Sequence, residues 1–259
     1  MTTVDLNAKI MIQERVASGQ VNWKWPLLLV FTRLILALVA QSLVALVFFH
    51  SEPSPYLAAG KWWPVYGVLI DLGCFFLVSW RAGKEGLRFR DLINYDSHRL
   101  GRDILRGLLY ILWVFPLAMV GILGFGLLLY GSPQPPPVYG PLPVWAAIYS
   151  LVFFPVFWGI MEQCTYQGYA LPRLDGSLKN TGLAVAIVAF GWGIQHIALP
   201  LTFDPRFMLF RFLSFLPLAV VMTLVYLRTR RLIPFIFAHW AVDMFGILTG
   251  IILPILMVK

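Results

Sequence analysis

The chain carries a glutamate, two histidines and an aspartate inside segments that are otherwise apolar. Glu162 lies near the middle of an apolar segment that runs from about Leu142 to Leu171. His196 falls in the next apolar segment, and His239 and Asp243 fall in the last one. An ionisable group at the centre of a membrane costs roughly 2.5–3.5 kcal/mol on insertion scales, so these residues indicate a functional site whose members partner one another.

Two kinds of water-activating chemistry suit this set of side chains. A carboxylate can act as general base on water while imidazoles stabilise the developing oxyanion. Alternatively, Glu162, His196 and His239 could bind zinc as a His₂Glu site that activates water. His239 and Asp243 are four residues apart, which places both on one face of a helix.

The composition predicts that transmembrane helices position these residues. Hydrophobic residues make up 59% of the 259-residue chain and charged residues 12%, with a mean hydropathy of +0.78. A soluble domain has about 25% charged residues. We therefore expect an all-α, polytopic membrane bundle of seven spans, or eight if the last run is divided, at about 25–49, 62–80, 104–130, 142–171, 181–199, 207–227 and 232–258. Pro155 is expected to kink the fourth span, and Asp71 is expected to form a structural pair with Arg33.

The distribution of basic residues predicts a cytoplasmic N-terminus. In that orientation the inner segments hold fifteen Lys and Arg residues and the outer segments three, namely Lys61, Arg206 and Arg211. This asymmetry accounts for the formal net charge of +8 without a nucleic-acid partner. Residues 1–24 are expected to form a short cytoplasmic tail, amphipathic or disordered, in which four apolar residues could touch the membrane surface (Ile10, Met11, Val16 and Val21).

The spacing of the polar residues resembles the CAAX protease and bacteriocin-processing family (CPBP, Abi) of intramembrane proteases. The pattern of that family is Glu-Glu-x₃-Arg on one helix, Phe-x₃-His on the next and His-x₃-Asn/Asp near the end. The matching residues here are Glu162-Gln163-x₃-Gln167, Trp192-x₃-His196 and His239-x₃-Asp243. The resemblance covers roughly residues 144–246, and the first three spans add nothing specific to it.

Two departures from the family pattern concern a supporting pair. Gln163 and Gln167 stand where the family has Glu and Arg, and Trp192 stands where Phe is common. Losing one charge alone would leave the other unpaired in the membrane. Because both charges are absent together, we expect the two amides, four residues apart, to hydrogen-bond to each other in place of an ion pair.

The resemblance implies an intramembrane endopeptidase that hydrolyses a membrane-associated or prenylated peptide or protein, with no cofactor. Glu162 would be the general base, and His196 would position the water or polarise Glu162. His239 and Asp243 would form the oxyanion side, with Asp243 orienting the imidazole. Residues 142–259 would form the catalytic bundle, residues 25–141 three preceding helices, and a bacterial plasma membrane is the expected location.

Other interpretations stay open at this point. One is a zinc-dependent form of the same protease, and another is a non-catalytic membrane protein that binds hydrophobic peptides, as in bacteriocin immunity. The missing charges at positions 163 and 167 favour the non-catalytic, peptide-binding protein. A transporter is a weaker alternative. Linear counting also places His196 nearer the outer end of its span than Glu162, so helix tilt must bring the two together for the catalytic interpretation to hold.

Overall fold

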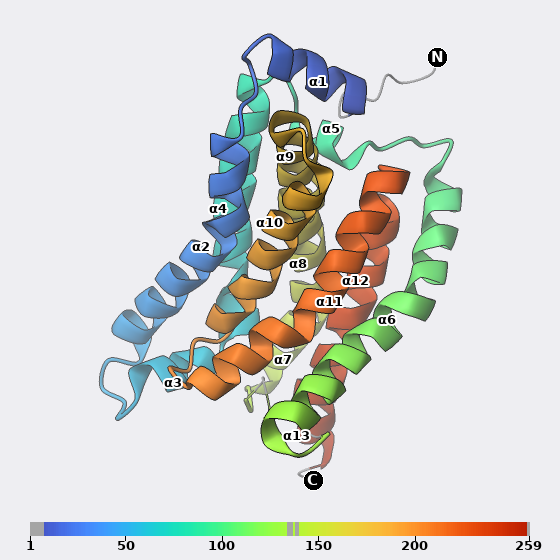
Figure 1. The fold of residues 1–259 in the computed structure, drawn as a ribbon. Helices are drawn as coiled ribbons and strands as arrows, with labels where there is room; N and C mark the ends of the chain where they lie inside the picture. Colours follow the sequence, from blue (N-terminus) through green and yellow to red (C-terminus); the bar gives the residue numbers. More distant parts are fainter. Residues whose placement is uncertain (1–7, 134–136, 138–139, 258–259) are drawn as a thin grey trace.

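The computed structural model describes residues 8–133, 137 and 140–257, and every regular element within these ranges is a helix. Seven continuous helical segments there are long and apolar enough to cross a membrane (Figure 1). They are α2 (Lys24–Phe48), α4 (Trp63–Lys84), α6 (Leu100–Tyr130), α7 to α9 (Val144–Leu178), α10 with η2 (Thr181–Ala198), α11 (Pro205–Thr229) and α12 to α13 (Ile233–Met257). The predicted polytopic helix bundle is confirmed. Val258, the predicted end of the last span, lies outside the described residues.

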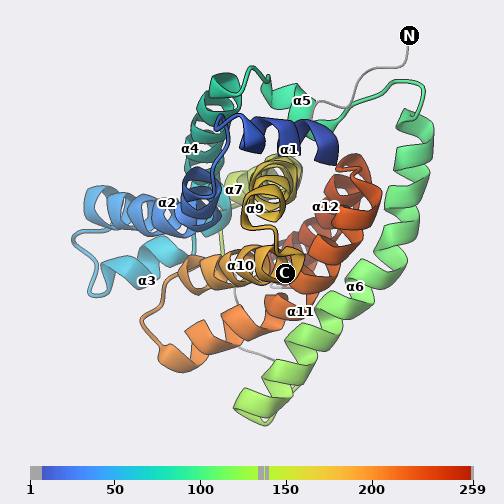
Figure 2. The same ribbon diagram turned by 45° about the horizontal axis from the view of Figure 1, so that its top comes forward.

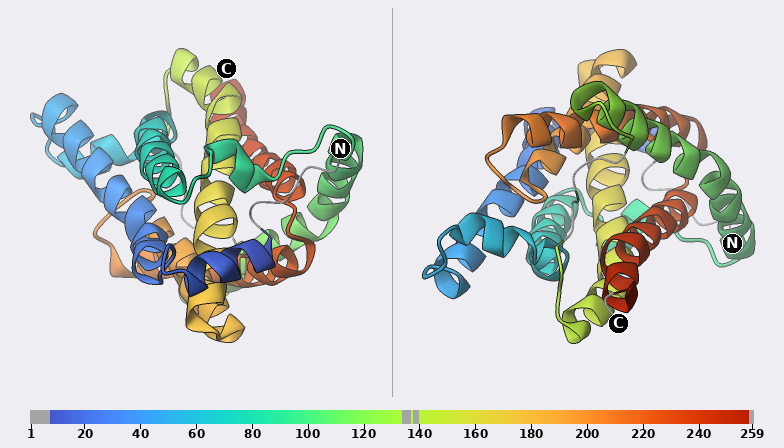
Figure 3. Two further views of the ribbon diagram at one scale, coloured as in Figure 1. Left: turned by 90° about the horizontal axis from the view of Figure 1, so that it is seen from above. Right: turned by 90° about the horizontal axis from the view of Figure 1, so that it is seen from below.

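The segment from α7 to α9 runs through the middle of the bundle (Figure 3). Its part α8 (Phe154–Gln163) packs against α4 on one side and α12 (Ile233–Ile247) on the other. Helices α2 and α4 pack together, α10 (Thr181–Ile194) packs on α11, and α6 covers both α11 and α12. The helix that bears Glu162 is therefore enclosed by helices from both ends of the sequence.

Several spans change helical type close to the polar residues. The fourth span breaks at Phe153, between α7 (Val144–Val152) and α8, and Pro155 lies in the first turn of α8, where the predicted kink falls. Immediately after Gln163 the chain forms a π-helix, η1 (Cys164–Ala170), before continuing as α9 (Leu171–Leu178). Such π segments are frequent at functional sites. The last span contains a second one, η3 (Leu248–Ile252), before α13 (Leu253–Met257).

One glycine allows α10 to lie close to α2. A Cβ atom at Gly191 would come within 2.0 Å of Val30 Cγ1 and 3.0 Å of the Val30 carbonyl oxygen. Only a residue without a side chain permits this approach, which is a common device in membrane helix pairs. The contact brings the end of α10, with His196, towards α2.

The N-terminal segment forms part of the bundle. Helix α1 (Lys9–Ala17) packs across α9, with Ile12 and Val21 buried (Figure 2). Of the four residues expected at the membrane surface, Ile10 is exposed, whereas Val21 is buried against the protein. The prediction of a membrane-contacting tail is wrong for Val21, because its side chain is buried within the protein. Residues 1–7 lie outside the described ranges.

Two short helices lie in the connections between the first three spans, α3 (Pro55–Gly60) and α5 (Phe89–Ile93).

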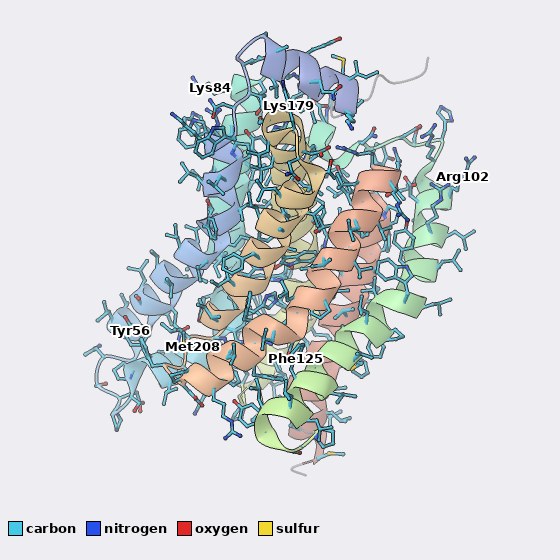
Figure 4. All side chains as sticks on the ribbon, viewed as in Figure 1. Tyr56, Lys84, Arg102, Phe125, Lys179 and Met208 are labelled. Atoms are coloured by element: carbon cyan, nitrogen blue, oxygen red, sulfur yellow. The ribbon has the colours of Figure 1, made fainter. Side chains whose placement is uncertain are left out.

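Basic side chains gather at the end of the bundle that carries α1. Figure 4 shows Lys84, Lys179 and Arg102 towards this end and Tyr56 and Met208 towards the opposite end. We call the former the α1 end.

Buried ion pairs tie helices together at the α1 end. Arg173 of α9 contacts Glu85 after α4 through Nη2–Oε2 at 2.7 Å, and Tyr169 Oη donates to the same carboxylate at 2.7 Å. Arg231 before α12 pairs with Asp103 of α6. These pairs connect the starts and ends of four spans.

Candidate active site

A cavity of about 60 Å³ lies among α4, α6, α8, α11, α12 and the end of α10. Four of its lining residues are the predicted chemical groups, Glu162, His196, His239 and Asp243. Helix α10 is followed by a short 3₁₀ turn, η2 (Gln195–Ala198), whose His196 lines the same cavity as Glu162. The structure thus brings together the two residues that linear counting separates. Because one water needs about 10–15 Å³ on this measure, the cavity has room for a few water molecules.

Glu162 and the pair on α12 are in direct contact. His239 Nε2 lies 3.0 Å from Glu162 Oε2 and 3.5 Å from Asp243 Oδ2. The predicted shared helix face of His239 and Asp243 is confirmed. The Glu162 side chain is fully buried, whereas those of His239 and Asp243 are 12% and 15% exposed. One imidazole N–H therefore faces two carboxylates at the wall of the cavity.

The opposite nitrogen of His239 determines which tautomer faces the cavity. The Gln163 amide nitrogen lies 3.0 Å from His239 Nδ1. An amide nitrogen only donates, so Nδ1 accepts this bond and a neutral His239 carries its proton on Nε2. Gln163 thereby orients His239 with an N–H donor towards Glu162.

His196 has the reverse arrangement. Its Nδ1 lies 3.0 Å from the Trp192 carbonyl oxygen and 3.2 Å from that of Gly193, so Nδ1 carries the proton and donates. The ring stacks on Phe215 with centroids 4.0 Å apart. The remaining nitrogen, Nε2, is an acceptor in the neutral imidazole. The two histidines thus provide one hydrogen-bond acceptor and one donor to the same cavity.

Arg33 of α2 reaches the other oxygen of Glu162. The predicted pair with Asp71 is confirmed, with Nη1–Oδ1 at 2.9 Å. In addition, Arg33 Nε lies 3.8 Å from Glu162 Oε1 and donates to Gln195 Oε1 at 3.0 Å. The Gln195 amide nitrogen in turn donates to Glu162 Oε1. The first two spans therefore contribute residues next to Glu162, although they add nothing specific to the family resemblance.

One further residue, Arg211, differs from its predicted place. Arg211, counted with the outer segments from its position in the sequence, is buried in α11, lines the cavity and donates to the Leu199 carbonyl oxygen at 2.8 Å. Helix α11 begins at Pro205, more than a turn before Arg211, and so carries this residue into the bundle.

The predicted hydrogen bond between the two substituted glutamines does not form. The amide nitrogen of Gln163 contacts His239, and both polar atoms of Gln167 are buried without a hydrogen-bond partner among the described residues. The Gln163 amide nitrogen, which was expected to donate to Gln167, donates to His239 instead. Trp192, the third predicted supporting residue, lines the cavity, stacks on Tyr166 with centroids 5.9 Å apart and interacts with the Glu162 carboxylate.

The side chains as arranged do not fit a three-ligand metal site. Within the described ranges no group of three or more His, Cys, Asp or Glu side chains has the proximity needed to hold a metal ion. The Glu162 oxygens face Gln195 and His239. A zinc site built from Glu162, His196 and His239 would require these contacts to be exchanged.

Comparison with known proteins gives a family match, over the segment that contains the polar residues. No curated protein and no solved structure gives a significant match to the chain. Residues 143–245 match the family described as type II CAAX prenyl endopeptidase Rce1-like, and this range contains every residue of the three sequence patterns. The match supports an intramembrane protease of the CAAX type in general. The segment 143–245 is therefore similar to the Rce1-like family, which agrees with the resemblance to the CPBP proteases.

Proposed function

We propose that the protein is an intramembrane endopeptidase in which the Glu162 carboxylate activates a water molecule. The observation that carries this proposal is a fully buried glutamate at the wall of a cavity with room for a few water molecules, with histidines of opposite hydrogen-bonding character beside it. A chain that spans a membrane keeps such a group at considerable cost, which favours a chemical role.

The two acceptors of the site can hold the attacking water. A water in the cavity can donate one hydrogen to Glu162 and the other to His196 Nε2, which leaves a lone pair free for attack. As the water oxygen bonds to the peptide carbonyl carbon, Glu162 takes the proton and the carbonyl oxygen becomes an oxyanion. Breakage of the C–N bond then moves that proton from Glu162 to the leaving amine, so the products are a carboxylic acid and an amine.

His239 is the group that can stabilise the oxyanion. Gln163 keeps its proton on Nε2, at the cavity wall, and Asp243 lies 3.5 Å from the same atom. A fixed N–H donor in a water-poor site stabilises developing negative charge strongly. Asp243 assists by holding the imidazole in place, the role expected for a carboxylate at this position.

The gathering of basic residues supports the orientation of the chain in the membrane. Lys84, Arg102 and Lys179 lie towards the α1 end, which we assign to the cytoplasmic side of a plasma membrane. The substrates in this proposal are hydrophobic or prenylated peptides that reach the site from the bilayer. No cofactor takes part in the steps above.

A comparison of peptide termini in membranes tests the proposal. Cells would express the wild-type protein, Glu162→Gln or Glu52→Gln at matched levels, and new N-termini would be labelled and sequenced by mass spectrometry. Glu52 is an exposed loop glutamate and serves as the charge control. Termini present with wild type and Glu52→Gln but absent with Glu162→Gln would support the protease and name its substrate. Identical termini in all three membranes would overturn it in favour of a non-catalytic, peptide-binding protein.

A further inference from the structure

Arg33 lies beside Glu162 although it comes from α2, outside the family-matched residues 143–245. Its side chain is fully buried. The guanidinium stacks on Trp158 with Cζ 4.1 Å from the ring centroid, and its atoms face two different acids, Asp71 through Nη1 and Glu162 through Nε. If Arg33 only neutralised Asp71, the contact through Nη1 would be sufficient, and Nε would not need to face Glu162.

The Gln195 side-chain amide lies between Arg33 and the Glu162 carboxylate, and its contact with Arg33 fixes the orientation of the amide. Its Oε1 accepts from Arg33 Nε at 3.0 Å, so its amide nitrogen is the atom that faces Glu162 and donates to Oε1. Arg33 has no acceptor atoms, and therefore the amide cannot be reversed without losing this bond. Oε1 of Glu162 is held by the protein, and Oε2 is left on the side of His239.

The charges of the site require a cation at this position. Asp71, Glu162 and Asp243 are all acidic, and Arg33 is in ion-pair distance of the first two. Charges interact strongly in a buried, low-dielectric site. Without Arg33, burial would favour a protonated Glu162, which cannot act as a base.

We infer that Arg33, acting through Gln195, is a positioning residue that keeps Glu162 ionised and turned with one oxygen available to water. This inference rests on the proposed function of Glu162 as general base. It adds a site component from the first span, where the sequence pattern of the family has none.

Four proteins separate this role from a structural ion pair. They are wild type, Asp71→Asn, the double variant Arg33→Met/Asp71→Asn, and Arg231→Met/Asp103→Asn as a matched control. The control removes a second buried Arg–Asp pair, which joins α12 to α6 at the α1 end. Both double variants remove a cation and an acid together, so neither leaves an unpaired partner from the pair itself.

Two measurements are made on each protein after thermal unfolding has shown that it is folded. The first is cleavage of an internally quenched peptide that carries a farnesylated cysteine near its C-terminus. The second is labelling of Glu162 by dicyclohexylcarbodiimide, which adds to protonated carboxyl groups, followed by mass spectrometry. Labelling of the wild type at acidic pH shows that the reagent reaches the cavity.

The account predicts that Arg33→Met/Asp71→Asn cleaves about 100-fold more slowly than wild type, as expected for a misplaced catalytic group. Its Glu162 should be labelled at neutral pH, and raising the pH should restore part of the rate. Asp71→Asn and the control should stay close to wild type in both measurements. Wild-type cleavage and labelling in Arg33→Met/Asp71→Asn would overturn the inference. A wild-type protein that fails to cleave while the labelling differs as described would contradict the protease proposal and leave the role of Arg33 standing.

Discussion

Two buried charge networks in this bundle are built differently. At the α1 end, Arg173 binds Glu85 through two nitrogens, Nε at 2.8 Å and Nη2 at 2.7 Å from Oε2, and Tyr169 adds a hydrogen bond to the same carboxylate. One acid there meets one base through a contact of two nitrogens. At the cavity, in contrast, Glu162 and Asp243 each face the same imidazole.

The cavity network also leaves hydrogen-bonding capacity unused. Asp243 Oδ2 and Arg33 Nη2 are buried without a hydrogen-bond partner among the described residues. Buried polar atoms of native proteins nearly always find partners, so these atoms are the ones that water or substrate would meet. Under the proposed function, the α1-end network holds helices together and the cavity network is retained for chemistry at some cost in stability.

The largest effect should come from the histidines of the cavity. His239→Gln and His196→Gln should each lower cleavage of the farnesylated peptide by at least about 100-fold, because each removes a group that faces the reacting atoms. His98, an exposed residue in a loop, provides the control, and His98→Gln should keep the wild-type rate. Full activity of either cavity variant would contradict a chemical role for that histidine. The cavity network would then not differ in function from the α1-end network.

The next effect should be on stability at the α1 end. Arg173→Met should destabilise the folded protein by about 3–5 kcal/mol, because it leaves the buried Glu85 carboxylate unpaired. Thermal unfolding in detergent would measure this, and the cleavage rate per folded molecule should be unchanged. Arg173→Met/Glu85→Leu should recover much of the lost stability. A loss of cleavage without a loss of stability would mean that this network also serves the reaction.

A smaller effect should separate the two substituted glutamines. Gln163→Leu should lower cleavage about tenfold, the equivalent of one hydrogen bond, because His239 would lose the donor that fixes its tautomer. Gln167→Leu removes an amide whose polar atoms have no partner, so it should not lower the unfolding temperature and should change the rate less. The reverse order of rates would show that Gln167 is the supporting residue.

The smallest effect should follow removal of metal. A chelator should leave the cleavage rate unchanged, and metal analysis of the purified protein should find less than one zinc per chain. One zinc per chain together with loss of cleavage in chelator, restored by zinc, would instead establish a Glu162, His196 and His239 metal site. The contacts that now hold Glu162 to Gln195 and His239 would then have to rearrange.

Hydropathy and spacing predicted the parts of the structure that depend on local sequence. Six of the seven spans agree with their predicted ranges to within a few residues. The fourth continues beyond its predicted end, to Leu178. His239 and Asp243 could be placed on one face because a four-residue spacing fixes it. Glu162 and His196 could be chosen because ionisable residues are rare in apolar segments.

The reach of Arg33 to Glu162 could not be predicted in the same way. It depends on how α2 and α8 are rotated and on a long side chain extended past Asp71, and neither is encoded in spacing along the chain. The role of Gln195 depends on the 3₁₀ turn at the end of α10. Arg211 was counted with the outer segments although it falls within the predicted span 207–227, and its burial beside the cavity depends on tertiary packing.

A paired measurement on two buried glutamates tests the central claim most directly. Glu162→Gln and Glu85→Gln each replace a buried carboxylate by an amide of nearly equal size, and both the cleavage rate per folded molecule and the unfolding temperature would be measured. The account predicts that Glu162→Gln abolishes cleavage without lowering the unfolding temperature, whereas Glu85→Gln lowers the unfolding temperature and keeps cleavage. Retained cleavage in Glu162→Gln would contradict a water-activating role for this carboxylate.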